Sequence, residues 1–280
     1  MGILLGLGVA VTYGGADFIG GFTAKHSATG AVVFFGQAAG LLAALMFAVA
    51  LGGDPEPRDL TLGMSAGVVG IVGVTALYRG LAVGRMGVVA PITAVVNAMI
   101  PLGWGLAQGE RPSGLAYVGV AMALFAVVLI AYEPDVEDDS PAAASRTTQV
   151  LLGLAAGVGF GIALVCFAET SSDSGVWPGF AARCTTVPLL ALVLLIGRRV
   201  LLPHRGDRRL VAVGGVLDAG ANAFQLLAVR EGLLALVAPV SALYPAGTVL
   251  LARLVLHERI GRARLLGLAV ALAGLVLIAV

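Results

Sequence analysis

Polar residues are rare in the long apolar segments of this sequence, and three of them share one helix face. Asp218, Asn222 and Gln225 follow one another at intervals of four and three residues within the apolar segment 210–228. On a helix this spacing places them in one stripe. A carboxylate and two amides can bind a small polar solute or form a structural hydrogen-bond network. Because polar groups on a helix in lipid must face protein or water, we expect the stripe to form a pocket wall.

Two further charged side chains lie inside apolar segments. Tyr13 and Asp17 are four residues apart in the first apolar segment and therefore share a face, and Arg183 lies within segment 176–196. A charge at the bilayer centre costs at least about 2.5–3.5 kcal/mol, so each one calls for a reason. Asp17 could hold a proton, bind a cationic solute or make a structural hydrogen bond. Arg183 could bind a carboxylate or phosphate of a solute, or pair with Asp218 or Asp17.

Single polar side chains in three other apolar segments complete the candidate site. Gln37 and Asn97 are amides, and Tyr244 combines a hydroxyl with an aromatic ring next to Pro245. Proline leaves a carbonyl without its helical donor, which can bend a helix or face a ligand. The predicted substrate-binding residues are Tyr13, Asp17, Gln37, Asn97, Arg183, Asp218, Asn222, Gln225 and Tyr244.

The composition indicates a polytopic membrane protein. Of the 280 residues, 59% are hydrophobic and only 12% are charged, and the mean hydropathy is +1.00. Soluble domains carry roughly 25% charged residues, whereas runs of about 20 apolar residues are typical of membrane-spanning helices. We predict an all-α fold with ten transmembrane helices, at about 2–22, 30–51, 60–78, 87–106, 115–131, 150–167, 176–196, 210–228, 233–255 and 265–280.

The sequence contains one long stretch twice. Residues 87–131 recur as residues 235–279, at a constant offset of 148. The matched pairs include Pro91 with Pro239, Glu110 with Glu258 and Gly119 with Gly267. Small residues four apart also recur near the start of each half, as Gly6, Ala10 and Gly14 and as Gly153, Gly157 and Gly161. A constant offset identifies an internal repeat, and the small-residue stripes predict close helix packing.

The repeat predicts how the chain is organised. We expect a first five-helix repeat at 1–131, an acidic linker rich in Ala, Pro and Ser at 132–148, and a second five-helix repeat at 149–280. Because five is odd, the second repeat enters the membrane from the opposite side. Inverted repeats of this kind are a recurring build of secondary transporters, which bind substrate near the bilayer midplane between the halves.

The charges of the loops indicate an orientation. Of the 17 Lys and Arg residues, 12 fall in odd-numbered loops and three in even-numbered loops. By the positive-inside rule, the odd loops would be cytoplasmic and both termini outside.

Three motifs stand out: YGGADFIGG from Tyr13, the pattern AL-Y-R-G-LAVG-R-MGVVAP…P…GER…G from Ala76 to Gly119, and a second copy of that pattern, LLAVREG…VAPVSALYPAGTVLLARLVLHERI…G. These motifs resemble the EamA domain of the drug/metabolite transporter superfamily. The resemblance covers nearly the whole chain. It implies a ten-helix inner-membrane carrier of small organic solutes, such as amino acids or other metabolites, and often an exporter. The family usually has both termini in the cytoplasm, contrary to the charge count, so the orientation stays open.

These observations predict a secondary transporter that moves small organic metabolites out across the cytoplasmic membrane by alternating access. The alternatives are an exporter of cationic drugs or toxic compounds, a passive channel and a scaffold. An enzyme is not expected. His26, His204 and His257 lie in loops or at helix ends, and no zinc-binding, GxSxG or phosphate-binding motif occurs. We therefore expect no metal and no cofactor.

The expected partners are a small organic solute and the lipid bilayer. Transport could be coupled to protons, for which Asp17 and Asp218 are the acidic groups deep enough in the membrane. The net charge of +1 does not indicate nucleic-acid binding. The glycine stripes allow a homodimer without requiring one.

Overall fold

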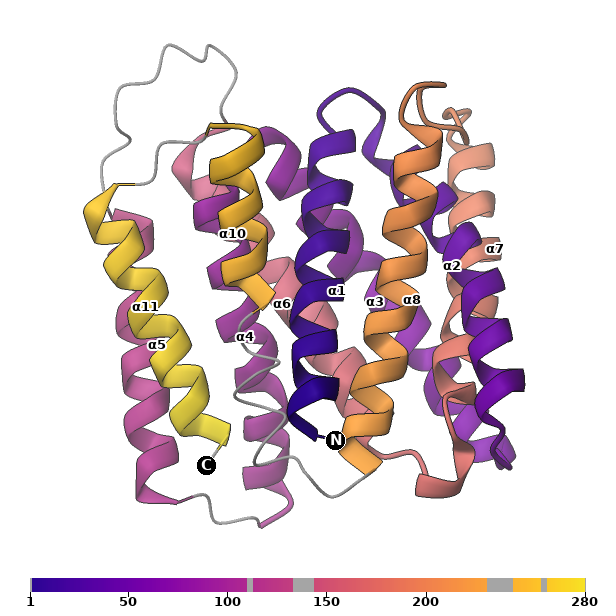
Figure 1. The fold of residues 1–280 in the computed structure, drawn as a ribbon, viewed down its shortest axis with the longest axis horizontal. Coiled ribbons are helices and arrows are strands. Elements are labelled where there is room, and N and C mark those ends of the chain that lie inside the picture. Colours follow the sequence, from indigo (N-terminus) through magenta and orange to yellow (C-terminus); the bar gives the residue numbers. More distant parts are fainter. Residues whose placement is uncertain (1, 110–112, 133–143, 231–243, 258–260, 280) are drawn as a thin grey trace.

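The computed structural model describes residues 2–109, 113–132, 144–230, 244–257 and 261–279. These residues form an all-helical bundle in which ten α-helices lie roughly side by side (Figure 1). The helices are α1 (Gly2–Thr23), α2 (Thr29–Leu51), α3 (Pro57–Val83), α4 (Met86–Ala107), α5 (Gly114–Tyr132), α6 (Arg146–Ala168), α7 (Trp177–Ile196), α8 (Arg208–Arg230), α10 (Tyr244–Val255) and α11 (Arg262–Ala279), with a short 3₁₀ turn η1 (Ser172–Ser174) before α7.

Capping residues explain why α3 and α6 begin earlier than the apolar pattern predicts. α3 starts at Pro57, which is suited to a first helical position, and Glu56 and Asp59 form a capping box there. The side chain of Ser145 caps α6 by accepting a hydrogen bond from the backbone N–H of Thr148. The last residues assigned to the linker are therefore the first turn of a helix.

The bundle is a polytopic membrane fold. In the described part of the chain, six helices are long and apolar enough to cross a membrane: α2, α3, α4, α6, α7 and α8. The large apolar side chains on α2, such as Leu42, Met46 and Val49, point outward, whereas its buried face consists mainly of Gly and Ala. This distribution suits lipid, where small residues allow helices to approach closely and bulky apolar ones face the hydrocarbon.

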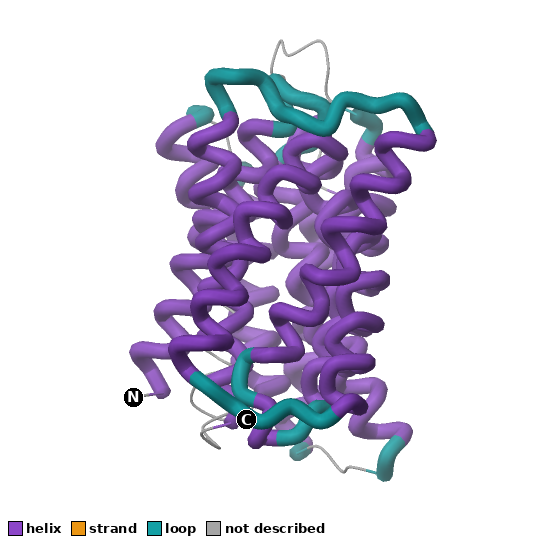
Figure 2. The backbone as a smooth tube through the Cα atoms, turned by 90° about the vertical axis from the view of Figure 1, so that its right-hand side faces the viewer, coloured by secondary structure: helices purple, strands orange, loops and turns teal. Residues whose placement is uncertain are grey.

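The helices pack in pairs drawn from distant parts of the chain. α1 packs against α8 and α10, and α6 packs against α3 and α4. α2 and α7 pack against each other, and in addition α2 packs against α8 and α7 against α3. α5 and α11 form a further pair beside α4. The connections lie at the two ends of the bundle (Figure 2), and both termini lie at the lower end of Figure 1.

Glycines make the closest of these contacts. A Cβ atom on Gly215 would lie 2.0 Å from the carbonyl oxygen of Gly36, and one on Gly67 would lie 2.2 Å from that of Ala182. The small-residue stripes also pack as predicted. A Cβ on Gly14 would lie 3.0 Å from the carbonyl oxygen of Tyr244, and one on Gly161 would lie 2.5 Å from the Cβ of Ile100. The prediction of tight helix packing at these stripes is confirmed.

Some of the predicted features lie outside the described residues. These are residues 133–143 of the predicted linker, the part of the ninth predicted helix before Tyr244, and Glu110, Pro239 and Glu258 of the matched pairs.

Candidate functional site

A cavity of about 180 Å³ lies between the two halves of the bundle. One water molecule needs roughly 10–15 Å³ of such space, so the cavity has room for a small organic molecule. All nine residues predicted to bind substrate line it: Tyr13, Asp17, Gln37, Asn97, Arg183, Asp218, Asn222, Gln225 and Tyr244. They come from α1, α2, α4, α7, α8 and α10. That they bind substrate remains a prediction.

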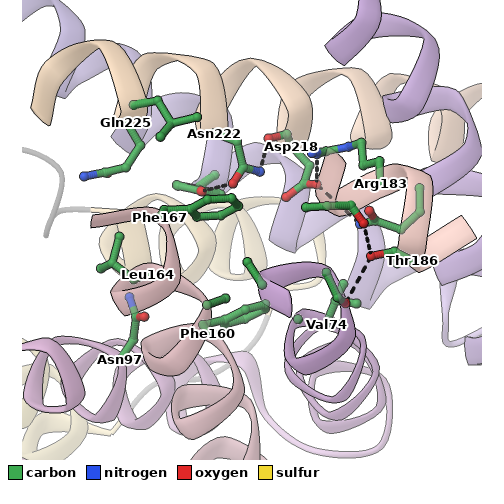
Figure 3. Close-up of a pocket in the computed structure, with 18 of the residues that line it drawn as sticks. Val74, Asn97, Phe160, Leu164, Phe167, Arg183, Thr186, Asp218, Asn222 and Gln225 are labelled. Carbon is green, nitrogen blue, oxygen red and sulfur yellow. Dashed lines mark hydrogen bonds and ion pairs between the residues drawn. The ribbon is translucent and has the colours of Figure 1, made fainter. Parts of the chain in front are cut away.

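The polar stripe of α8 forms one wall of the cavity. Figure 3 shows Asp218, Asn222 and Gln225 along one face of the helix. The side-chain amide of Asn222 donates to the backbone carbonyl of Asp218 at 2.8 Å, and its Oδ1 accepts a hydrogen bond from the Tyr13 hydroxyl at 3.1 Å. Tyr13 therefore ties α1 to the polar face of α8.

Arg183 and Asp218 form a buried ion pair across α7 and α8. Their Nη2 and Oδ2 atoms are 2.6 Å apart, and their side chains are only 5% and 19% exposed. Gln37 Nε2 lies 3.4 Å from the same carboxylate oxygen. Of the two protein partners that the sequence allows for Arg183, the structure therefore selects Asp218.

A glycine on the neighbouring helix makes room for the guanidinium group. A Cβ on Gly40 would lie 2.9 Å from Arg183 Nε and 2.7 Å from the carbonyl oxygen of Gly215. Nη1 of Arg183 makes a long contact of 3.5 Å with the carbonyl of Gly179, and Nε has no partner among the described residues. The guanidinium is thus held mainly by Asp218.

Asp17 is the second carboxylate of the cavity, and its surroundings differ from those of Asp218. The residue is 8% exposed and lines the cavity, but no described residue donates a hydrogen bond to its carboxylate or pairs with it. The ring of Tyr13, one turn away, lies 6.0 Å from that of Tyr244 at an angle of 58°. An unpaired carboxylate beside two aromatic rings is suited to a positively charged group.

The opposite wall of the cavity is apolar. Phe160, Leu164 and Phe167 of α6 and Val74 of α3 line it, and Figure 3 shows Phe160, Leu164 and Val74 across from the α8 stripe. Asn97 and Tyr78 add polar groups on this side, and the Oδ1 atom of Asn97 is buried without a partner among the described residues. The cavity therefore combines a mainly apolar wall with the polar stripe of α8.

With its carboxyl groups ionised, the described lining has a formal charge of −1. Arg183 is the one cation among the described lining residues, and Asp17 and Asp218 are the two anions. Because Arg183 is paired with Asp218, the carboxylate of Asp17 is left uncompensated. In the described part of the chain, no group of three or more His, Cys, Asp or Glu side chains could hold a metal ion.

The second half of the chain matches the family model of the EamA-like transporter family over residues 147–280. This half is an EamA-like transporter domain. A solved crystal structure also resembles the chain: it covers 99% of this chain and 95% of its own, with a TM-score of 0.66 and 17% sequence identity. At that identity the likeness concerns the fold alone. None of the curated proteins matches the sequence.

This match confirms the resemblance that the sequence motifs suggest for the second half of the chain. EamA-like proteins are a family of transporters in the drug/metabolite transporter superfamily and not a family of enzymes. The chain is accordingly a multi-pass membrane protein, and its second half is a transporter domain of the drug/metabolite type.

The EamA-like domain also supplies a wall of the cavity that the sequence reasoning missed. α6 contributes Phe160, Ala163, Leu164 and Phe167, and α3 of the first half contributes Gly70 and other residues. Apolar residues in a membrane helix carry no local signal of function. The repeat in the sequence could have indicated these residues. The polar residues already place α1 and α8 at the site, and by the offset of the repeat α6 corresponds to α1 and α3 to α8.

Proposed function

We propose that the chain is a secondary transporter that exports small organic metabolites with a protonated amino group across the cytoplasmic membrane by alternating access. The observation that carries the proposal is the unpaired carboxylate of Asp17, which lines a mid-bundle cavity beside Tyr13 and Tyr244. A solute amino group would bind there, and its carbon skeleton would lie against Phe160 and Leu164. Amino acids have this combination of groups.

The proposed scaffold is a pair of inverted five-helix repeats, 1–131 and 149–280, joined by the linker 132–148. The packing supports this division. In the proposed repeats, α1 corresponds to α6, α8 to α3 and α10 to α4. The contacts of α1 with α8 and α10 therefore have equivalents in the contacts of α6 with α3 and α4. The contacts of α2 with α8 correspond to those of α7 with α3 in the same way.

The closest helix contacts support the same correspondence residue by residue. Gly215 is 148 residues after Gly67, and Ala182 is 146 residues after Gly36, the offset between α2 and α7. Gly215 packs against the carbonyl of Gly36, and Gly67 packs against the carbonyl of Ala182. A symmetric scaffold of this kind can close at either end, as alternating access requires.

The starting points of α1 and α6 support the inversion. Gly20 and Gly21, at the end of α1, pack against Tyr78 and Leu81, near the end of α3. The start of α6 lies at the same end of the bundle, because the backbone N–H of Ala144 donates to the carbonyl of Val83 at 2.7 Å. α1 and α6 therefore begin at opposite ends.

Counterflow in proteoliposomes tests the proposed function. Each labelled amino acid is tested beside a matched amine, which has the same structure but lacks the carboxylate. We expect saturable uptake that is stimulated by unlabelled solute on the opposite side, and that is lost in Asp17→Asn. Arg253→Gln removes an exposed charge on α10, outside the cavity and the helix connections, and serves as the control. Flux without saturation or counterflow would identify a channel, and full activity in Asp17→Asn would exclude the proposed binding site.

A second candidate function is the export of cationic compounds that lack a carboxylate. The net negative charge of the lining favours it, because the one described cation of the cavity is already paired. The same experiment separates the two candidates. Preferential transport of amines over the matched amino acids supports the cation exporter, and the reverse preference supports the amino-acid exporter.

A further inference from the structure

Two carboxylates occupy corresponding positions at opposite ends of the bundle. Asp59 lies in the first turn of α3, and Asp207 directly precedes α8. They are 148 residues apart, the offset of the repeat, and neither lines the cavity. In Figure 1 the start of α3 lies at the lower end of the bundle and the start of α8 at the upper end.

Asp59 binds a connection of the other repeat. The residue is 2% exposed. Its Oδ1 accepts the backbone N–H of Ser171 at 2.8 Å, and its Oδ2 accepts the Ser171 hydroxyl at 2.8 Å and the backbone N–H of Glu56 at 3.1 Å. Nearby, the backbone N–H of Asp54 donates to the carbonyl of Asp173 at 2.8 Å. This Asp59 clamp joins the α2–α3 connection to the α6–α7 connection.

Asp207 makes the equivalent contact at the other end. Its Oδ2 accepts the hydroxyl of Ser27 at 2.8 Å, and the same Ser27 oxygen accepts the backbone N–H of His204 at 2.9 Å. This Asp207 clamp joins the α7–α8 connection to the α1–α2 connection. In both clamps, a carboxylate at the start of the third helix of one repeat binds a serine that follows the first helix of the other.

Each clamp therefore crosses between the two halves at one end of the bundle only. In alternating access, the halves separate at one end while they stay together at the other. A hydrogen bond that joins the halves at one end exists when that end is closed and is lost when it opens. Such a differential contact shifts the population toward the state that is closed at its own end.

We infer that the Asp59 and Asp207 clamps are opposing gates, and that their relative strength sets which end of the cavity is open. This inference rests on the alternating-access part of the proposed function and not on the substrate. Asp59 and Asp207 are positioning residues in this scheme, because they act through the geometry of the helices and do not touch the solute. The structure has both clamps closed.

Thiol labelling of the cavity tests the inference without a known substrate. Gly70 lines the cavity, and a Cβ there meets nothing within 4 Å, so Gly70→Cys provides a reporter that fits. The native thiols are removed as Cys166→Ala and Cys184→Ala. Right-side-out and inside-out membrane vesicles are treated with a membrane-impermeant maleimide. The two preparations report the two faces of the membrane, so the orientation need not be known beforehand.

Ser171→Ala and Ser27→Ala weaken one clamp each. Each removes a hydrogen bond to a carboxylate, which changes the ratio of the two states by about tenfold or more. We expect Ser171→Ala to raise labelling from one face and lower it from the other, and Ser27→Ala to do the reverse. Ser27→Ala is expected to have the larger effect, because Ser171→Ala leaves Asp59 the backbone N–H of Ser171 as a donor from the other half.

The double variant separates gating from a merely structural role. Because the two losses favour opposite ends, the Ser27→Ala/Ser171→Ala chain should return the labelling ratio toward that of the parent. Ser65→Ala is the matched control, since the Ser65 hydroxyl binds the carbonyl of Thr61 within α3 and does not cross between the halves.

Two results would overturn the inference. The first is that both single substitutions change the ratio of labelling from the two faces in the same direction, and that the double variant changes it further in that direction. The other is labelling that no variant alters, including labelling that is absent throughout. If the labelling shifts as expected but no solute shows counterflow, the inference about the gates is supported and the proposed substrate class is wrong.

Discussion

The Arg183–Asp218 pair allows a quantitative prediction about what the buried charges do. Asp218→Asn keeps the shape of the side chain but leaves the guanidinium of Arg183 without its counter-charge. Arginine cannot lose its proton inside a protein, and the Arg183 side chain is only 5% exposed. Breaking a buried pair in this way costs about 3–5 kcal/mol. Since Asp218 is 19% exposed, we expect the lower end, about 3 kcal/mol.

The double variant Asp218→Asn/Arg183→Met removes both charges and fills the space with an apolar side chain. Replacing a whole buried ion pair by apolar or neutral groups is often close to neutral, so we expect a loss of about 1 kcal/mol or less. The double variant should therefore be more stable than Asp218→Asn alone by about 2 kcal/mol, which is a direct measure of the unpaired arginine.

The measurement is unfolding of the purified protein in mixed micelles of increasing SDS content, followed by circular dichroism. Asp17→Asn is the comparison, because Asp17 has no described partner, so its neutralisation leaves no other charge unpaired and should not destabilise the protein. The reasoning fails if Asp218→Asn costs less than about 1 kcal/mol, or if the double variant is less stable than either single variant.

Three shorter predictions concern the site, the packing and the orientation. Tyr13→Phe removes the hydrogen bond to Asn222 but keeps the ring, so solute affinity in a binding assay should fall about three- to tenfold, and an unchanged affinity would exclude a role for the hydroxyl. Gly215→Ala places a methyl group 2.0 Å from the Gly36 carbonyl and should abolish a monodisperse peak in size-exclusion chromatography, whereas Gly70→Ala, with nothing within 4 Å, should not. If the positive-inside rule decides the orientation, the C-terminus lies in the periplasm, and a fluorescent protein fused there should stay dark. Fluorescence of the fusion would show that the C-terminus lies in the cytoplasm, as is usual in the family.

The apolar pattern and the membrane environment explain why much of the fold and site could be predicted. A polar side chain inside a membrane helix is costly, so the few that occur are conspicuous, and each of the nine predicted residues lines the cavity. The glycine stripes likewise predicted the contacts of Gly14 and Gly161, because no other residue allows backbones to approach so closely.

The features that the sequence did not reveal have no such local signal. Asp59 and Asp207 lie at helix starts, where carboxylates are common as caps, so nothing distinguishes them before their partners are known. Phe160 and Leu164 look like any lipid-facing residues of a membrane helix. The choice of Asp218 over Asp17 as the partner of Arg183 depends on how α7 and α8 pack, which the spacing within one helix does not determine.

In the proposed mechanism, the two halves of the chain are alike where the bundle moves and differ where the solute binds. The glycine contacts of Gly67 and Gly215 and the clamps of Asp59 and Asp207 are alike in both halves. At the cavity, by contrast, Asp218 corresponds to Gly70, and the ion pair has no counterpart across the repeat. Alternating access needs two halves that can exchange roles, whereas binding an asymmetric solute needs a polar wall facing an apolar one. A duplicated chain meets both requirements when its contacts between helices stay symmetric and its lining does not.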